Sequence, residues 1–134
     1  MLVVDDVSVV RHAVFRFLSE VGFRVFEAAN AGEALEVLST ARPAVQLVIA
    51  DVIMPDVNGV DLARLIREQW PGTRVIFMSA FPAEVLAREG LANLEVVFLA
   101  KPFTRDELVG KVEEALRGPP QRNGERSRLG REAP

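Results

Sequence analysis

The chain has 134 residues, 49% hydrophobic and 26% charged, which is enough for one soluble globular domain with a substantial core. It contains no cysteine, which excludes disulfides and thiolate metal sites, and its net charge of -3 gives no electrostatic basis for binding nucleic acid. No apolar run approaches the roughly 20 residues of a membrane span, and no signal segment precedes the first apolar run, so a cytoplasmic location without membrane contact is expected.

The first part of the chain alternates short apolar runs with helical patterns. Residues 2–4 predict a strand, and residues 8–22 predict a helix that stops at Gly22, with these apolar residues on one face: Val10, Ala13, Val14, Phe17, Leu18 and Val21. Residues 23–28 predict the second strand. Asn30 and Glu33 have capping-box spacing at the start of a second helix, which is expected to close at Pro43.

The same alternation continues to residue 117. A strand at 46–51, a helix at 60–70, a strand at 74–79, a helix at 82–90, a strand at 95–100 and a helix at 104–117 are expected in that order. Thr104 and Glu107 have the spacing of a second capping box. Residues 118–134 have no apolar periodicity and are rich in Pro, Gly and Arg, so they are expected to form a disordered tail or linker after a domain at 1–117.

Strict alternation of strands and helices predicts an α/β fold with helices on both faces of a parallel sheet. The expected architecture is a flavodoxin-like, doubly wound (βα)5 three-layer sandwich with strand order 2-1-3-4-5. Its switch point lies between the first and third strands, where ligands bind at the carboxyl ends.

Polar residues end four of the five predicted strands: Asp5 and Asp6, Asp51, Ser79, and Lys101. Three neighbouring carboxylates in a crevice need a cation, and an all-oxygen set suits Mg²⁺, with Mn²⁺ as an alternative. With an ammonium and a hydroxyl added, the set suits a phosphoryl group. Taken singly, Asp5, Asp6 or Ser79 could instead cap the following helix, and Lys101 could be a solvated loop residue.

The segments VVDD, DVIMPDVNG, MSA and KPF occur in this order, and over residues 1–117 the chain resembles the receiver domain of bacterial two-component response regulators, such as the chemotaxis regulators. The resemblance implies that Asp51 accepts a phosphoryl group from a histidine kinase or histidine phosphotransfer domain. It also implies that Asp6, Asp51 and the Ile53 backbone carbonyl ligate Mg²⁺, with Asp5 acting through water.

The resemblance further assigns a switch. Ser79 takes the position of the hydroxyl that turns toward the phosphoryl group, and Phe98 that of the aromatic residue that moves inward with it. Lys101 would hold the phosphoryl oxygens, and its bond to Pro102 is expected to be cis. Ordinary core packing is the alternative for Phe98, whose lack of a hydroxyl would make a nearby output surface more apolar.

Two apolar residues depart from the commonest family pattern. Ile53 and Phe81 stand where polar residues often occur, so a long-lived aspartyl phosphate and slow autophosphatase activity are expected rather than turnover. On the outer face of the first helix, Phe15 is a candidate docking contact or ordinary surface apolarity. His12, on the same face, is expected to be a surface residue and not a catalytic one.

Other functions and contexts stay open at this point. Asp51 could be the nucleophile of a metal-dependent phosphohydrolase, or the domain could bind partners without phosphorylation. The chain could be a stand-alone receiver or a segment of a longer protein such as a hybrid kinase, which its very short first strand slightly favours. The output partner is unknown, and a phosphorylation-dependent dimer is an expectation.

Overall fold

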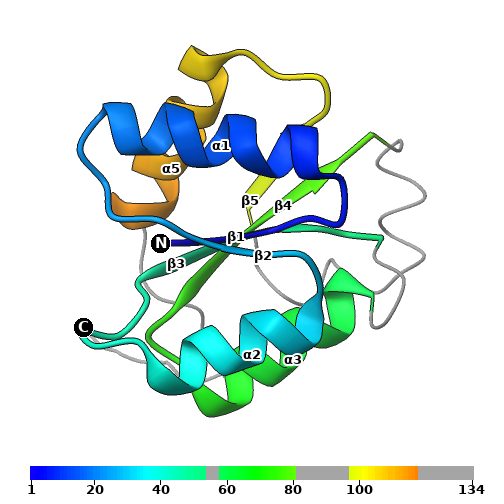
Figure 1. Ribbon diagram of the computed structural model, residues 1–134, viewed down its shortest axis with the longest axis vertical. Helices are drawn as coiled ribbons and strands as arrows, with labels where there is room; N and C mark the ends of the chain where they lie inside the picture. The colour runs from blue at the N-terminus through cyan, green and yellow to red at the C-terminus, as the bar shows by residue number, and fades with distance from the viewer. Residues whose placement is uncertain (54–57, 81–96, 118–134) are drawn as a thin grey trace, which may run out of the picture.

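A five-stranded parallel sheet forms the centre of the molecule. The computed structural model describes residues 1–53, 58–80 and 97–117 (Figure 1). The strands are β1 (Leu2–Val4), β2 (Phe26–Ala28), β3 (Leu47–Asp51), β4 (Arg74–Ser79) and β5 (Val97–Ala100). All pairings are parallel and the order is β2-β1-β3-β4-β5, which confirms the predicted doubly wound α/β fold.

Helices cover both faces of the sheet. Figure 1 shows α1 (Ser8–Glu20) and α5 (Arg105–Arg117) on one side, and α2 (Ala31–Thr40) and α3 (Gly59–Gln69) on the other. Alternate residues of one strand enter different cores: Leu2 and Val4 pack on the α2 and α3 side, whereas Val3 packs on the α1 and α5 side. This two-sided burial explains why the strands are continuous apolar runs.

The predicted helix ends are set by local hydrogen bonds. The Asn30 carboxamide oxygen accepts from the Glu33 N–H at 2.9 Å at the start of α2. Thr104 and Glu107 bond reciprocally at the start of α5, at 2.8 and 3.0 Å, which confirms this capping box. Gly22 has a φ of 101°, a conformation that favours glycine, just after α1 ends.

Some predicted elements differ from the observed ones. Val21 was expected on the buried face of the first helix, but it is 41% exposed because α1 ends at Glu20 and Val21 lies beyond it. The second strand covers only residues 26–28 of the predicted 23–28. The predicted helix at 82–90 and the tail at 118–134 lie outside the described residues.

Two X-Pro peptide bonds in the described residues are cis. The Lys101-Pro102 bond is cis as expected, and the Arg42-Pro43 bond is also cis, which the sequence did not indicate. Within the described ranges, no helix is both long and apolar enough to span a membrane.

Candidate functional site

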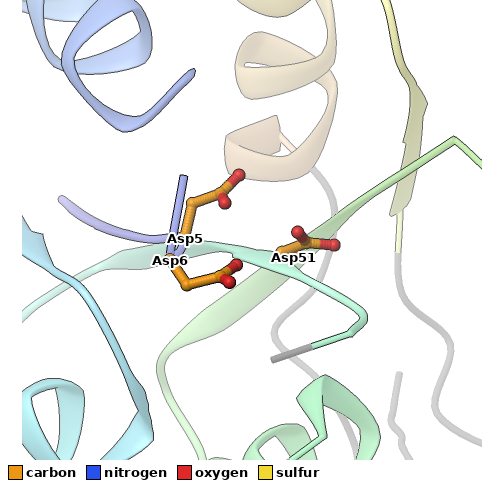
Figure 2. Close-up of side chains that lie close together, drawn as sticks. All are labelled: Asp5, Asp6 and Asp51. Carbon is orange, nitrogen blue, oxygen red and sulfur yellow. The ribbon is translucent and has the colours of Figure 1, made fainter. Parts of the chain in front are cut away.

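Three carboxylates meet at the carboxyl end of β1 and β3. These strands are neighbours, and Val4 is paired with Ala50, so the next residue on each, Asp5 just after β1 and Asp51 at the end of β3, emerge side by side. One oxygen from each of Asp5, Asp6 and Asp51 lies within 4.8 Å of the others (Figure 2). The sequence prediction that these acids cluster at the switch point is confirmed.

Asp5 is the buried member of the cluster. Its carboxylate is fully inaccessible; Oδ1 accepts from the Val7 N–H at 2.9 Å, and Oδ2 accepts from Lys101 at 3.0 Å. Its own N–H donates to the Ala28 carbonyl at the end of β2 at 3.1 Å. Val7, not an aspartate, occupies the N-cap position of α1, so the alternative that Asp5 or Asp6 serves as the helix cap is wrong. Asp6 is exposed.

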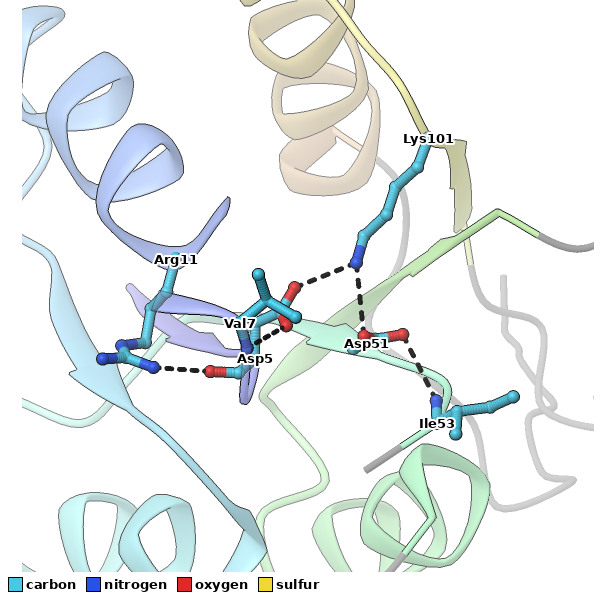
Figure 3. A network of polar contacts seen from close by, with 6 residues as sticks. All are labelled: Asp5, Val7, Arg11, Asp51, Ile53 and Lys101. Carbon is cyan, nitrogen blue, oxygen red and sulfur yellow. Dashed lines mark hydrogen bonds and ion pairs between the residues drawn. The ribbon is translucent and has the colours of Figure 1, made fainter. Parts of the chain in front are cut away.

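Lys101 bridges the two strand-end acids. Its Nζ lies 3.0 Å from Asp5 Oδ2 and 3.2 Å from Asp51 Oδ2, and its side chain is only 18% exposed (Figure 3). Its N–H donates to the Ser79 carbonyl at 2.8 Å, which extends the pairing of β5 with β4 to this residue. The alternative of a solvated loop lysine is therefore wrong.

The charges around Lys101 keep it cationic. Burial by itself lowers the pKa of this ammonium, but the hydrogen bond and charge of Asp5, with those of Asp51, outweigh burial and raise the pKa above 10.5. A permanent positive charge thus lies between two carboxylates.

Asp51 is held at both carboxylate oxygens. Oδ2 contacts Lys101, and Oδ1 accepts from the Ile53 N–H at 3.2 Å (Figure 3). Desolvation raises the pKa of Asp51 above 3.8, and the Asp5 charge adds to this, while Lys101 and the Ile53 N–H oppose it. The carboxylate is therefore less stabilised as an anion here than in water, despite its lysine partner.

The approach of α3 to the end of β3 depends on a glycine. Gly59 donates its N–H to the Val52 carbonyl at 2.6 Å, and Asn58 caps α3 by accepting from the Asp61 N–H at 2.9 Å. A Cβ at Gly59 would clash with the Asp51 carbonyl oxygen and lie 2.9 Å from the Val52 Cα. Only glycine allows this close approach of α3 to the end of β3.

The donor set fits a hard divalent cation. All three groups are carboxylates, and two oxygens on an octahedral Mg²⁺ lie roughly 3 to 4 Å apart, a spacing that falls within the 4.8 Å that separates these oxygens at most. Because Asp5 already uses both oxygens for Lys101 and Val7, the exposed Asp6 is the carboxylate most open to direct ligation. The same set suits Mn²⁺.

The two predicted switch residues occupy adjacent strands. Ser79 ends β4 and is 4% exposed, and its register partner on β5 is Ala100. Phe98 on β5 is paired with Phe77, with ring centroids 6.0 Å apart, and packs against the core on the α2 and α3 side. These positions fit core packing as well as a switch, so the switch roles stay predictions.

Three other side chains weighed in the sequence analysis lie on the surface in the described part of the chain. Ile53 is 53% exposed beside Asp51, and Phe15 is 36% exposed on α1. His12 is exposed, with its Nδ1 2.8 Å from Glu27 Oε1, as expected for a surface residue. Phe81 lies outside the described residues.

Sequence reasoning missed two residues that shape the site. Gly59 had no separate role in the prediction, although the Asn58 and Asp61 spacing is a helix-start signal that places it at the first turn of α3. Arg11, next to His12 in the first helix, had no role in the prediction, yet it donates to the Asp5 carbonyl at 2.7 Å. No pattern in the sequence indicates that contact.

Comparison with known proteins identifies the family of this chain. A family model described as the response regulator receiver domain matches residues 1–113. The chain is 36% identical over 116 residues to the sensor kinase CckA of Brucella abortus (strain 2308), covering 87% of this chain and 12% of that protein. It is 28% identical to sporulation initiation phosphotransferase F of Bacillus subtilis (strain 168), covering 87% and 92%.

Solved structures show the same fold. Chemotaxis protein CheY4 of Vibrio cholerae superposes with a TM-score of 0.78 at 29% identity, covering 86% of this chain and 96% of that one. The chain spans only 12% and 49% of the length of two of its curated relatives, so the match there is to one part of a longer protein. From the family match and the shared fold, the chain belongs to the response regulator receiver domain family.

Proposed function

We propose that this domain is a phosphoacceptor switch in a two-component phosphorelay. Asp51 accepts a phosphoryl group from a histidine kinase or a histidine phosphotransfer domain. The observation that carries this proposal is the Lys101 ammonium held by Asp5 and Asp51 beside a third carboxylate, Asp6. Such a set supplies a nucleophile, a cation for phosphoryl oxygens and oxygen ligands for a metal ion.

The transfer step uses the Asp51 carboxylate as nucleophile. One of its oxygens forms a bond to phosphorus, while the bond from phosphorus to the donor imidazole nitrogen breaks and that nitrogen keeps the electron pair. Lys101, already 3.2 Å from Asp51, can follow the new charge onto the phosphoryl oxygens. Its raised pKa keeps it protonated for this role at neutral pH.

A divalent cation, Mg²⁺ or Mn²⁺, would be held by Asp6, Asp51 and the Ile53 carbonyl, with Asp5 acting through water. The availability of Asp6 and the engagement of both Asp5 oxygens support this division. When bound, the ion would neutralise charge on the phosphoryl oxygens.

A phosphoryl group on Asp51 would be read out through Ser79 and Phe98. The two lie on neighbouring strands, so a movement of the Ser79 hydroxyl could be followed by the Phe98 ring on the α2 and α3 side of β5. A typical coupling of ~1 to 3 kcal/mol changes partner affinity about five-fold or more. The output partner and a phosphorylation-dependent dimer belong to this proposal.

The direct test is intact mass after incubation with acetyl phosphate, with and without Mg²⁺. The wild-type chain should gain one phosphoryl group only with Mg²⁺, and Asp51→Asn should gain none. Asp61→Asn, an exposed acid on α3, is the matched control and should behave as wild type. An adduct that survives in Asp51→Asn contradicts the assignment.

The same samples test the remaining parts of the proposal. The adduct should decay slowly, and Ile53→Asn should shorten its lifetime by admitting a better-placed water. Size-exclusion chromatography of the phosphorylated sample tests the dimer. Continuous phosphate release with multiple turnovers would instead favour a phosphohydrolase, and a folded, Mg²⁺-binding chain with neither adduct nor release would favour a binding-only receiver.

A further inference from the structure

Arg11 connects the acid cluster to the outer strand of the sheet. From the second turn of α1, its Nη1 donates to the Asp5 carbonyl at 2.7 Å and its Nε donates to Glu27 Oε1 on β2 at 3.1 Å. The side chains of Arg11 and Glu27 are 15% and 25% exposed, so both contacts are largely shielded from water. Figure 3 shows Arg11 reaching the backbone of Asp5 from the side opposite Lys101.

These contacts fix the turn at residues 5–7, between β1 and α1. The Asp5 N–H is bound by the Ala28 carbonyl, and the Asp5 carbonyl is bound by Arg11, which is itself held by the residue before Ala28. Both peptide groups of Asp5 are thus tied to β2 or to a side chain anchored on it. The next residue is Asp6, whose carboxylate is exposed, so its position depends on this backbone.

We propose that Arg11 and Glu27, here called the guanidinium clamp, position the turn at residues 5–7 so that its carboxylates can bind a divalent cation. The clamp deepens the proposed function, because it concerns the cation that phosphorylation of Asp51 would need. Arg11 is a positioning residue in this arrangement, since it contacts the Asp5 backbone and not the ion.

The chemistry of arginine suits this role. The planar guanidinium offers several N–H donors at fixed angles, so one side chain can hold a carbonyl and a carboxylate at once, whereas a lysine ammonium lacks that fork. The Arg11 charge, by contrast, opposes cation binding nearby. Positioning and simple electrostatics therefore predict opposite effects when Arg11 is replaced.

The test is Mg²⁺ binding by isothermal titration calorimetry with the unphosphorylated chain. Arg11→Lys keeps the positive charge but loses the fixed N–H donors of the guanidinium, and Arg11→Gln loses both the charge and these donors. We expect both to bind Mg²⁺ about 10-fold more weakly, in the range seen when partners that orient metal ligands are removed. Tighter binding by Arg11→Gln with unchanged binding by Arg11→Lys would show a purely electrostatic role and overturn the clamp.

Arg16 provides the matched control. It lies on the same helix, but its guanidinium stacks over Phe17, 5.4 Å from the ring centroid. Arg16→Lys and Arg16→Gln repeat the same charge changes and should alter Mg²⁺ affinity by less than about two-fold, because side chains that do not support the ligands have little effect on it.

Glu27→Gln tests the clamp without changing Arg11. It keeps an oxygen acceptor but weakens the ion pair, so Mg²⁺ affinity should fall by about three-fold, less than in the Arg11 variants. Thermal melts followed by circular dichroism establish that each variant is folded. If the Arg11 variants do not fold, Glu27→Gln decides, and unchanged affinity in that folded variant overturns the proposal.

A second measurement separates the clamp from general loss of structure. The rate of Asp51 phosphorylation by acetyl phosphate is followed against Mg²⁺ concentration in wild type and Arg11→Lys. The half-saturating Mg²⁺ concentration should rise about 10-fold in parallel with the binding constant, while the rate at saturating Mg²⁺ stays within about two-fold. A lowered rate at saturation with an unchanged half-saturation point contradicts positioning.

The two proposals fail separately. A wild-type chain that binds Mg²⁺ but gains no phosphoryl group contradicts the proposed function, and the calorimetric comparison still decides the clamp. A phosphorylated wild type with unchanged Mg²⁺ affinity in folded Arg11→Lys contradicts the clamp alone. If the wild-type chain shows no measurable Mg²⁺ binding, that result also overturns the clamp proposal.

Discussion

The carboxyl edge of the sheet and the outer surface of α5 contain the same kinds of groups in opposite environments. At the sheet edge, Lys101 pairs with the inaccessible Asp5, and Gly59 lies against the end of β3. On the α5 surface, Arg105 forms a 3.5 Å pair with Glu20 at the end of α1, with both side chains about half exposed, and a Cβ at Gly110 of α5 would meet nothing within 4 Å.

This difference shows that burial decides what each group contributes. An exposed ion pair contributes little because water already solvates both charges, whereas removing one partner of a buried pair leaves the other charge without compensation. The carboxyl edge also keeps like charges together where desolvation raises the pKa of Asp51. Such an arrangement costs stability, and perturbed groups of this kind cluster at functional sites in proteins generally.

The largest difference is expected between breaking the buried ion pairs of Lys101 and breaking the exposed ion pair of Arg105. Lys101→Met leaves Asp5 buried without a counter-charge and should lower the free energy of unfolding by about 3 kcal/mol, the lower end for a broken buried pair because Lys101 is partly exposed. Arg105→Met should cost less than about 1 kcal/mol. Urea unfolding at neutral pH without divalent cations measures both, and equal losses would refute the comparison.

The next-largest changes in stability are expected from adding a methyl group at Gly59 or at Gly110. Gly59→Ala forces a methyl group against the Asp51 and Val52 backbone and should destabilise by about 2 kcal/mol, as overpacking does. Gly110→Ala, in the middle of α5 with open space around it, should stabilise by roughly 0.5 to 1 kcal/mol because glycine is a poor helix former. Chemical denaturation of both variants should show changes of opposite sign; a stabilised Gly59→Ala would contradict the close approach.

The smallest changes in stability are expected from replacing Asp51 or Asp106, and the change at Asp51 should depend on pH. Without divalent cations, Asp51→Asn should raise the melting temperature at pH 7, because desolvation penalises the Asp51 carboxylate. Asp106→Asn, in the first turn of α5, should instead lose about 0.3 to 0.5 kcal/mol, since an acid there interacts favourably with the helix dipole.

The sign of the Asp51 effect follows from its raised pKa in the folded state. The penalty is complete above the folded pKa, shrinks as the carboxyl is protonated, and disappears below the ordinary pKa of 3.8 that applies to the unfolded chain. The advantage of Asp51→Asn should therefore fade between pH 7 and pH 4 in calorimetric melts. Added Mg²⁺ should stabilise wild type and not the variant; an advantage that grows toward low pH would contradict the assignment.

The sequence was sufficient for the order of elements and for the residues at the strand ends. Apolar runs, capping boxes and the alternation of helix and strand are local signals, so the parallel sheet and the positions of Asp5, Asp51, Ser79 and Lys101 could be predicted. Element ends were less certain: Val21 fits the apolar stripe of α1, but the helix stops one residue before it. A helical pattern does not specify where the hydrogen-bonded turns end.

The tertiary structure alone decided how these residues act on one another. Lys101 contacts two acids that lie 96 and 50 residues away. Arg11 binds the Asp5 carbonyl directly while Glu27 on β2 holds its guanidinium, and Gly59 is required by a backbone approach that no local pattern reports. Spacing along the chain determines which groups reach the carboxyl edge. Desolvation, pairing and steric contact arise only when separate segments meet, so the balance of charge at Asp51 could be known only from the folded molecule.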